Sequence, residues 1–319
     1  MHWLITGGCG FIGRNLIKKL LAADESDHVR IVDDFSVASV DDLDGALPDR
    51  GRLEVIRGDV RDEALALRAT AGVDVVVHLA ANTGIALSIS APREDCSVNV
   101  LGTLNYLEAS RRNGARRFVF ASSGATLGEA KPPIHEQLPA RPISPYGASK
   151  LAGEAYCSAY YGTFGIDTVA LRFGNCYGPG SDHKSSIVAK FIREALAGRR
   201  WEIFGDGNQT RDFVYIDDIV EAIRRAGTFS GVGGEIFQIA TNSETSVLAL
   251  ASLLSNVLSR KGINVQPPAH LPGRRGEVQS NYSDTSKART RLGWEATTDL
   301  TDGLRKTVEW FTTRERRFS

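Results

Sequence analysis

The chain has 319 residues, 42% hydrophobic and 24% charged, which is ordinary for a globular protein with a large core in one or two domains. Its 38 basic residues balance its 38 acidic residues, so no net charge attracts nucleic acid or an anionic membrane, and neither is expected as a partner. No apolar run reaches the ~20 residues that span a bilayer, so no membrane segment is expected.

The first half of the chain alternates short apolar strands with helical segments. Continuous apolar runs such as Val75–Val77 are typical of strands that are covered on both faces. The alternation predicts an α/β fold of the Rossmann type, a doubly wound parallel sheet with right-handed crossovers. The predicted strands are Trp3–Thr6, Val29–Val32, Leu53–Ile56, Val73–His78, Arg117–Ala121 and Thr168–Arg172, and the predicted helices are Phe11–Ala23, Glu63–Ala69, Arg93–Asn113 and Tyr146–Tyr161.

After about Gly174 the alternation loosens, and helices mix with short strands and glycine-rich turns. We expect residues 1–174 to form the Rossmann domain and residues 175–319 a smaller mixed α/β domain, with part of 209–240 packing back onto the first. A cleft between the two is the natural ligand site. The helices predicted in the second half are Ser186–Leu196, Asp217–Arg225, Val247–Leu258 and Leu300–Phe311.

A glycine-rich loop, with Gly7, Gly10 and Gly13, joins the first strand to the first helix. The pyrophosphate of a dinucleotide needs bare backbone amides at a helix N-terminus, where the helix dipole favours negative charge. Glycines at the first two positions let the chain turn and approach the phosphates, and the third lets the helix pack close to the strand. The loop predicts a dinucleotide site, with Phe11 and Ile12 also beside the cofactor.

Asp33 ends the second strand, 20 residues after Gly13. An acidic residue at this point accepts hydrogen bonds from the adenosine ribose and repels a 2′-phosphate. No arginine or lysine lies between Ile31 and Leu47 to bind such a phosphate, so NAD is favoured over NADP. Asp34 is the alternative, one residue later.

Tyr146 and Lys150 are four residues apart at the start of a predicted helix, so they share one helix face. A lysine ammonium and the positive ring of an oxidised nicotinamide both stabilise a tyrosine phenolate. For a base that works near neutrality, the tyrosine pKa must fall by about three units, or roughly 4 kcal/mol. Two cations in a partly dry cleft can supply that shift. We therefore predict proton and hydride transfer at this pair.

Together these motifs resemble the extended short-chain dehydrogenase/reductases of the NAD-dependent nucleotide-sugar epimerase/dehydratase type, to which UDP-glucose 4-epimerases belong. The resemblance covers nearly the whole chain. It implies that Ser123, in Phe120-Ala121-Ser122-Ser123, shares the substrate proton with Tyr146, with Ser122 as the alternative register. It also implies cofactor contacts from Asp59, Val60, Leu79, Ala80, Ala81, Asn99, Tyr146, Lys150 and Phe173.

The same resemblance implies where a UDP-sugar would bind. Asn175 would contact the phosphates, and Arg211 and Arg274 would each bind the diphosphate bidentately. Thr83 and Ser88 lie in a segment that is expected to line the sugar. A homodimer is also implied, through the helices 93–113 and 146–161 packed as a four-helix bundle.

The residues after Ser123 bear on the reaction. Dehydratases of the resembled family carry an Asp-Glu pair there, and decarboxylases carry a glutamate at the second position, whereas this chain has Gly124 and Ala125. Neither side chain can transfer a proton. We therefore expect epimerisation at C4 of a UDP-hexose through a transient 4-keto sugar. A dehydratase with displaced acid and base groups, a net oxidoreductase and a non-catalytic NAD-binding regulator remain the alternatives.

Leu127 and the four cysteines are two further features of the sequence. Leu127 stands where the family commonly has tyrosine, so one aromatic wall of the sugar pocket is expected to be missing, and neutral, N-acetyl and uronic acid sugars all remain open. The cysteines, at positions 9, 96, 157 and 176, are far apart without zinc spacing, so no metal is expected and free thiols in a reducing cytoplasm are favoured. The first residues lack the basic flank and apolar stretch of a secretion signal.

Overall fold

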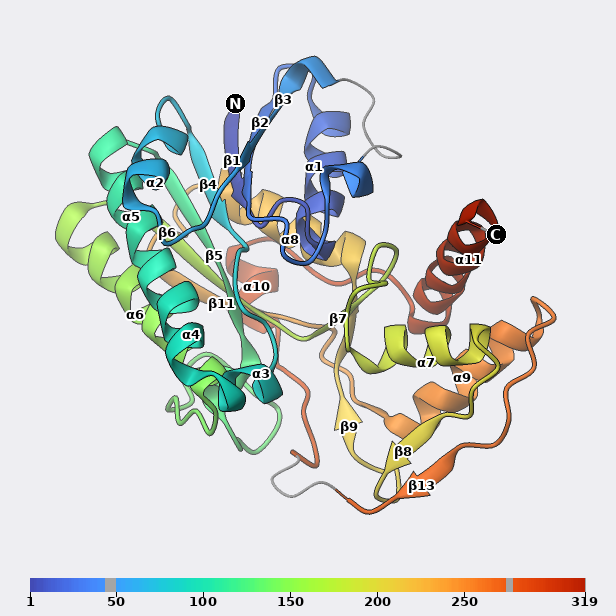
Figure 1. The fold of residues 1–319 in the computed structure, drawn as a ribbon. Helices are drawn as coiled ribbons and strands as arrows, with labels where there is room; N and C mark the ends of the chain where they lie inside the picture. The colour runs from blue at the N-terminus through green and yellow to red at the C-terminus, as the bar shows by residue number, and fades with distance from the viewer. Residues whose placement is uncertain (44–49, 274–277, 319) are drawn as a thin grey trace.

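The computed structural model describes residues 1–43, 50–273 and 278–318. Seven parallel strands form its central sheet in the order β11-β6-β5-β4-β1-β2-β3 (Figure 1). The order reverses between β1 and β4, which is the doubly wound arrangement, so the predicted fold class is confirmed. The strands are β1 His2–Thr6, β2 His28–Asp33, β3 Leu53–Arg57, β4 Val75–His78, β5 Arg117–Ser123, β6 Asp167–Phe173 and β11 Glu235–Ile239.

Helices cover both faces of this sheet, which explains why its strands are continuously apolar. Strand side chains alternate between the faces, so Trp3 and Ile5 of β1 belong to one apolar cluster and Leu4 to the other. The helices of one face are α1 Phe11–Ala23 and α8 Ile216–Thr228, and those of the other include α2 Glu63–Ala69, α5 Gly102–Asn113 and α6 Pro145–Phe164.

The helix expected over Arg93–Asn113 is not regular throughout, and in its middle turn the prediction is wrong. It consists of α4 Pro92–Cys96, a π-helical turn at Ser97–Leu101, and α5. The wider turn carries the buried side chain of Asn99, which bonds to neighbouring segments, and π turns often occur where a side chain has such a role.

The second half adds three small two-stranded sheets and several helices. The strand pairs are β7 Asn175–Tyr177 with β10 Phe213–Tyr215, β8 Glu202–Phe204 with β13 Ala269–Leu271, and β9 Thr210–Arg211 with β12 Thr245–Ser246. The helices are α7 Ile187–Leu196, α9 Val247–Ser259, α10 Ser286–Arg291 and α11 Leu300–Phe318. Sequence analysis did not predict α3 Ile85–Ser90 or the 3₁₀ turns at Val40–Leu43, Arg50–Arg52 and Gly124–Leu127.

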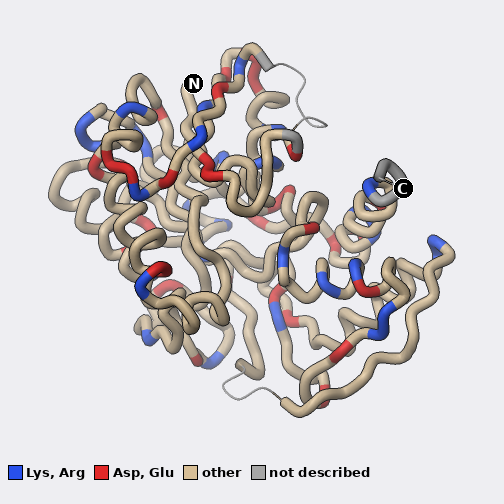
Figure 2. Tube along the Cα trace, in the orientation of Figure 1, with Lys and Arg blue, Asp and Glu red and all other residues tan. Residues whose placement is uncertain are grey.

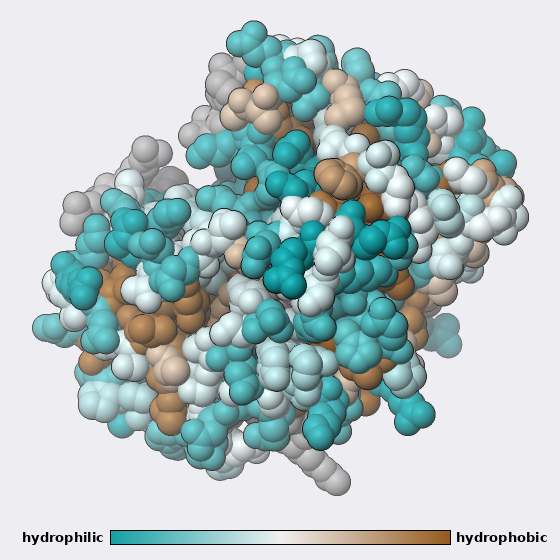
Figure 3. Space-filling view, turned by 180° about the vertical axis from the view of Figure 1, so that it is seen from behind, coloured by the Kyte–Doolittle hydropathy of each residue, from teal (hydrophilic) through white to brown (hydrophobic). Residues whose placement is uncertain are grey.

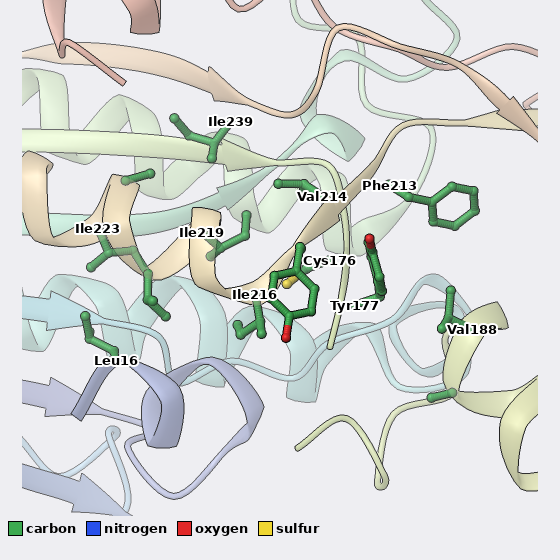
Figure 4. Packing of buried hydrophobic residues seen from close by; sticks show 14 of the residues in the cluster. Leu16, Cys176, Tyr177, Val188, Phe213, Val214, Ile216, Ile219, Ile223 and Ile239 are labelled. Carbon is green, nitrogen blue, oxygen red and sulfur yellow. The ribbon is translucent and has the colours of Figure 1, made fainter. Parts of the chain in front are cut away.

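The two halves share one apolar core. Leu16 of α1 and Ile219 of α8 lie in the same buried cluster as Tyr177 of β7 and Val188 of α7 (Figure 4). Two segments of the second half, α8 and β11, are part of the central three-layer structure, because α8 packs on α1 and β11 pairs with β6. The second half of the chain therefore completes the central sheet with β11 and covers one face of it with α8.

Charged side chains of both signs are interspersed along the trace (Figure 2), and the view from behind shows apolar surface as patches among polar side chains (Figure 3). Within the described ranges, no helix is long and apolar enough to cross a membrane. Within those ranges, no group of three or more His, Cys, Asp or Glu residues is placed to hold a metal ion. The four cysteines are free thiols, and only Cys96 is exposed.

Candidate active site

The predicted cofactor and catalytic residues gather at one edge of the sheet. Because the strands are parallel, their carboxyl ends all lie along that edge, where α/β proteins bind their ligands. The glycine loop follows β1, Asp33 ends β2, Asp59 follows β3, Leu79 follows β4, Ser123 ends β5 and Phe173 ends β6.

The glycine loop leaves room for a pyrophosphate at the start of α1. Gly7 has a φ of +67°, and a Cβ added there would lie 2.8 Å from the backbone nitrogen of Ala80. A Cβ on Gly13 would lie 2.5 Å from the carbonyl oxygen of Gly8. Gly10 is the N-cap, and the first turn, which begins with Phe11 and Ile12, carries no acidic side chain to repel a phosphate. The residues present therefore fit the cofactor that was predicted.

Asp33 is attached to this loop, whereas Asp34 is not. One carboxylate oxygen of Asp33 accepts from the Cys9 amide at 2.9 Å, and the other accepts from the Phe35 amide at 2.9 Å. Burial raises the pKa of Asp33. Asp34 is exposed and accepts from the amide and hydroxyl of Ser36, a local turn. The geometry favours Asp33 as the ribose-binding carboxylate.

The segments after β3 and β4, which were predicted to contact the cofactor, are held by local contacts. Asp59 pairs with Arg61, whose Nη2 lies 2.5 Å from its carboxylate. Val60 is buried against Gly102 at the start of α5, where an added Cβ would lie 2.7 Å from the valine side chain. Ala80 donates its amide to the hydroxyl of Thr6 at 3.2 Å, which fixes the segment of Leu79 and Ala81 beside the glycine loop.

Asn99 is fully engaged within the protein. Its side-chain oxygen accepts from the Asn82 amide at 2.8 Å, and its nitrogen donates to the Asn82 carbonyl at 3.0 Å and to Asp95 at 2.9 Å. The same nitrogen lies 3.2 Å from the hydroxyl of Ser149 on α6. Asn99 thus links the loop after β4 to the helix that carries the predicted catalytic residues.

Ser123, Tyr146 and Lys150 come together at the end of β5 and the first turns of α6. Ser144 is the N-cap of α6, and its hydroxyl accepts from the Gly147 amide at 3.1 Å. The Ser123 side chain interacts with the Tyr146 hydroxyl and lowers its pKa. Nζ of Lys150 lies 5.9 Å from the centre of the Tyr146 ring. The group has the composition expected of a proton-transfer site.

Burial dominates the pKa values of Tyr146 and Lys150 in the protein without cofactor. Burial raises the pKa of Tyr146 to about 12, although the interaction with Ser123 lowers it. Burial also lowers the pKa of Lys150 to about 8, although the carboxylates of Asp95 and Glu154 raise it. In the protein without its cofactor, desolvation thus outweighs the effect of Ser123. The predicted fall in the Tyr146 pKa needs the nicotinamide ring as well as Lys150 and stays a prediction. A positive nicotinamide ring would act in the opposite direction.

Ser122, the alternative to Ser123, is buried and lies 2.5 Å from Glu154 of α6. Glu154 also pairs with Arg172 of β6. Sequence analysis missed Asp95, Glu154 and Arg172. The signal for Arg172 was present, since a charged residue inside a continuously apolar strand must be buried and paired.

The predicted substrate residues are only partly brought together. Thr83 is exposed before α3, and the buried Ser88 donates to the Ile85 carbonyl at 2.8 Å. Asn175 is exposed at the start of β7, and its amide donates to the carbonyl of Asp212, next to Arg211. Nη1 of Arg211 lies 2.8 Å from the Val278 carbonyl.

The remaining predicted positions are Arg274 and Leu127. Arg274 lies outside the described residues. Leu127, expected at the sugar pocket, is 1% exposed and belongs to the buried apolar residues. The contacts of the predicted substrate residues with a ligand stay predictions.

Comparison with known proteins places these features in a family. The model of the NAD-dependent epimerase/dehydratase family matches residues 3–240. A UDP-glucose 4-epimerase of Mycolicibacterium smegmatis is 37% identical over 316 residues, with 98% of each chain covered. A crystal structure of the UDP-glucose 4-epimerase of Thermotoga maritima with UDP-glucose superposes with a TM-score of 0.90 at 34% identity, covering 99% of this chain and all of that one.

A second solved structure is a UDP-glucuronic acid 4-epimerase of Bacillus cereus in complex with UDP-glucuronic acid and NAD. It superposes with a TM-score of 0.88 at 31% identity, covering 98% of this chain and all of that one.

Proposed function

This chain belongs to the NAD-dependent epimerase/dehydratase family, and from that premise we propose that it is an NAD-dependent UDP-sugar 4-epimerase. The observation that carries the proposal is the grouping of Ser123, Tyr146 and Lys150: Ser123 interacts with the Tyr146 hydroxyl, and Nζ of Lys150, one turn further along the same helix, lies 5.9 Å from the centre of the Tyr146 ring. Several relatives over nearly the full length of the chain are UDP-sugar 4-epimerases, one of them solved with NAD, and dTDP-glucose 4,6-dehydratases match over a similar length at 31% identity.

In the proposed reaction, Tyr146 removes the proton of the C4 hydroxyl and later returns it. Ser123 shares that proton, and the ammonium of Lys150 stabilises the phenolate. The glycine loop and Asp33 would hold NAD, which when bound supplies an acceptor for the C4 hydride and a donor for its return. Because the hydride comes back on the other face of the sugar, no cofactor is consumed.

The residues beyond Ser123 distinguish this reaction from dehydration. Gly124 and Ala125 form the 3₁₀ turn after β5 and carry no group that can transfer a proton. Elimination of a C6 hydroxyl needs an acid and a base beside C5 and C6. Epimerisation needs only the tyrosine and its partners.

The direct test is to incubate the purified protein, without added NAD, with UDP-glucose, UDP-N-acetylglucosamine and UDP-glucuronate in turn. We expect at least one C4 epimer, detected by NMR, with no net reduction of cofactor. A 4-keto-6-deoxy product would identify a dehydratase instead. If no UDP-sugar is converted, the proposed function is wrong.

We also propose a homodimer formed through α4, α5 and α6, which lie side by side at one edge of the molecule (Figure 1). Large apolar side chains are exposed there, with Phe164 at 51% and Leu101 at 51%. An exposed apolar surface of this kind supports association. Sedimentation velocity on the wild type and on Phe164→Glu tests it, since a charge at the interface should yield monomer.

A cytoplasmic location is proposed as well. Three buried free cysteines and one exposed one are typical of a reducing compartment. Fractionation of cells that express a tagged chain would check this, and recovery outside the cytoplasm would contradict it.

A further inference from the structure

We propose that Glu154 is a positioning residue, which fixes the first turns of α6, with Tyr146 and Lys150, against the end of β5. The inference rests on the proposed function, because it takes the tyrosine and the lysine as the reacting pair. Glu154 itself lies one helical turn beyond Lys150 and acts by holding the tyrosine and the lysine in position.

Glu154 binds two neighbouring strands through a single carboxylate. Its Oε1 accepts from the Ser122 hydroxyl at 2.5 Å and from Nε of Arg172 at 2.7 Å, and its Oε2 accepts from Nη2 of Arg172 at 2.7 Å. Ser122 and Arg172 are register partners in β5 and β6. One side chain of α6 is therefore fixed against both strands at the same level of the sheet. Ser122 is 4% exposed, and the other two are each 3% exposed.

These bonds lie directly beside the reacting groups. Ser122 precedes Ser123 in β5, and Glu154 follows Lys150 by one helical turn. A helix rises about 1.5 Å per residue, so a small slip of α6 along β5 would separate the tyrosine from its serine partner. A displacement of about 1 Å can lower a rate by ~10²-fold.

A buried ion pair of this kind is better suited to fixing geometry than to adding stability. The free-energy cost of removing two charges from water offsets most of their attraction. Proteins with an apolar pair of similar volume in place of a buried ion pair are often equally stable. The Ser122 bond adds a directional link that an apolar pair would lack. The buried polar network therefore indicates that α6 has to keep a fixed position along β5.

The charge of Glu154 also bears on Lys150. The groups that face this lysine are Tyr146 of its own helix, Asp95 of α4, His78 of β4 and the ring of Phe120 of β5. Burial keeps His78 neutral, with its pKa lowered to about 3. The carboxylates of Asp95 and Glu154 thus oppose the burial that lowers the pKa of Lys150 to about 8. Without Glu154, the ammonium would be lost at a lower pH.

The test replaces the whole pair. Changing Glu154 alone leaves Arg172 buried without its partner, which can prevent folding. The double variant Glu154→Leu/Arg172→Met keeps the volume apolar. We expect a Tm near that of the wild type, a KM within about twofold and a kcat lower by roughly tenfold or more. We also expect the alkaline limb of the pH profile to move to lower pH.

The opposite ends of the same two strands offer a control ion pair, which is less buried because the Asp167 side chain is 41% exposed. Nη2 of Arg117, at the start of β5, lies 2.9 Å from the carboxylate of Asp167, at the start of β6. Arg117→Met/Asp167→Leu should change Tm while leaving the pH profile in place and kcat within about twofold of the wild type. A purely structural role of Glu154 would make the two double variants behave alike.

A second variant keeps the proposal testable if the double variant does not fold. Ser122→Ala leaves the ion pair intact, and we expect kcat to fall about threefold or more at unchanged KM. Wild-type kcat in Ser122→Ala, or wild-type kcat and pH profile in Glu154→Leu/Arg172→Met, would overturn the positioning role. A wild-type protein that epimerises no UDP-sugar would instead overturn the proposed function, and Tyr146→Phe provides the inactive reference.

Discussion

Ser122 and Ser123 are adjacent in β5, yet the first hydroxyl donates to Glu154 at 2.5 Å and the second interacts with the Tyr146 hydroxyl, whose pKa it lowers. Strand side chains alternate between the two faces, so neighbours cannot serve the same partner. A register difference of one residue therefore separates the serine that lies beside Tyr146, the proposed catalytic residue, from the serine that bonds to Glu154.

Ser123→Ala should lower kcat by about 10²-fold, the size expected when a group that shares a transferred proton is removed. Ser123→Thr keeps a hydroxyl and should retain most of the rate. Steady-state assays of both variants with an accepted UDP-sugar provide the measurement. Wild-type turnover in the alanine variant would exclude Ser123 from the proton path.

Tyr146→Phe should bind NAD normally and lose at least about 10²-fold in kcat, because the phenylalanine ring keeps the packing but has no proton to exchange. NAD binding is measured by fluorescence titration, and turnover is measured separately. Tyr156→Phe, at an exposed position of the same helix, is the control and should behave as wild type. Undiminished turnover at position 146 would contradict the mechanism.

Asp33→Ala should raise the Kd for NAD by about 10- to 100-fold, since hydrogen bonds to a charged group contribute roughly 1.5–3 kcal/mol. Asp34→Ala should change it by less than about twofold, because the exposed Asp34 carboxylate bonds to Ser36 of the turn that it begins. Titration calorimetry on both variants decides between them. The reverse ranking would show that the ribose site is one residue further along.

Gly13→Ala should abolish NAD binding, because its Cβ would lie 2.5 Å from the Gly8 carbonyl oxygen and push the loop out of shape. Gly162→Ala serves as the comparison, since nothing lies within 4 Å of a Cβ there and its φ is ordinary. Gly162 lies in the last turn of α6, so that change should stabilise the fold by at most about 0.5–1 kcal/mol. Tm and NAD titration together test the pair of variants.

His78 should make the fold less stable in acid. Its pKa is lowered from 6.5 to about 3 by burial, so its stabilising effect is complete above pH 6.5 and is lost as the pH falls toward 3. Between pH 7 and pH 5 this group alone should reduce the free energy of unfolding by about 2 kcal/mol. Urea unfolding at both pH values should show a smaller reduction in His78→Leu. The exposed His270→Leu should keep the wild-type reduction.

Much of the fold could be predicted because local signals coincide with its boundaries. The glycine loop marks the start of α1, and Asp62 caps α2 by accepting from the Leu65 amide, so both helices begin where they were expected. The place of β11 could not be predicted. A five-residue strand after a glycine turn carries no information about which edge of a sheet it joins.

The proximity of Tyr146 and Lys150, the proposed reacting residues, was predictable for a different reason. Tyr146 and Lys150 form a pattern whose spacing follows from helix geometry, whereas Glu154 and Arg172 are remote in sequence and meet only in the folded chain. The rise that burial causes in the Tyr146 pKa of the protein without cofactor could not be predicted, because a helical spacing does not reveal the extent of burial.

The late position of α8 and β11 in the chain has a consequence for biosynthesis. When the ribosome has released only the first 174 residues, α1 has no α8 to pack on and β6 has an open edge. Domains fold during translation as units, and this unit is incomplete until residue 239 has emerged. The nascent chain must therefore keep apolar surface exposed for some 65 further residues, during which chaperones have access to it.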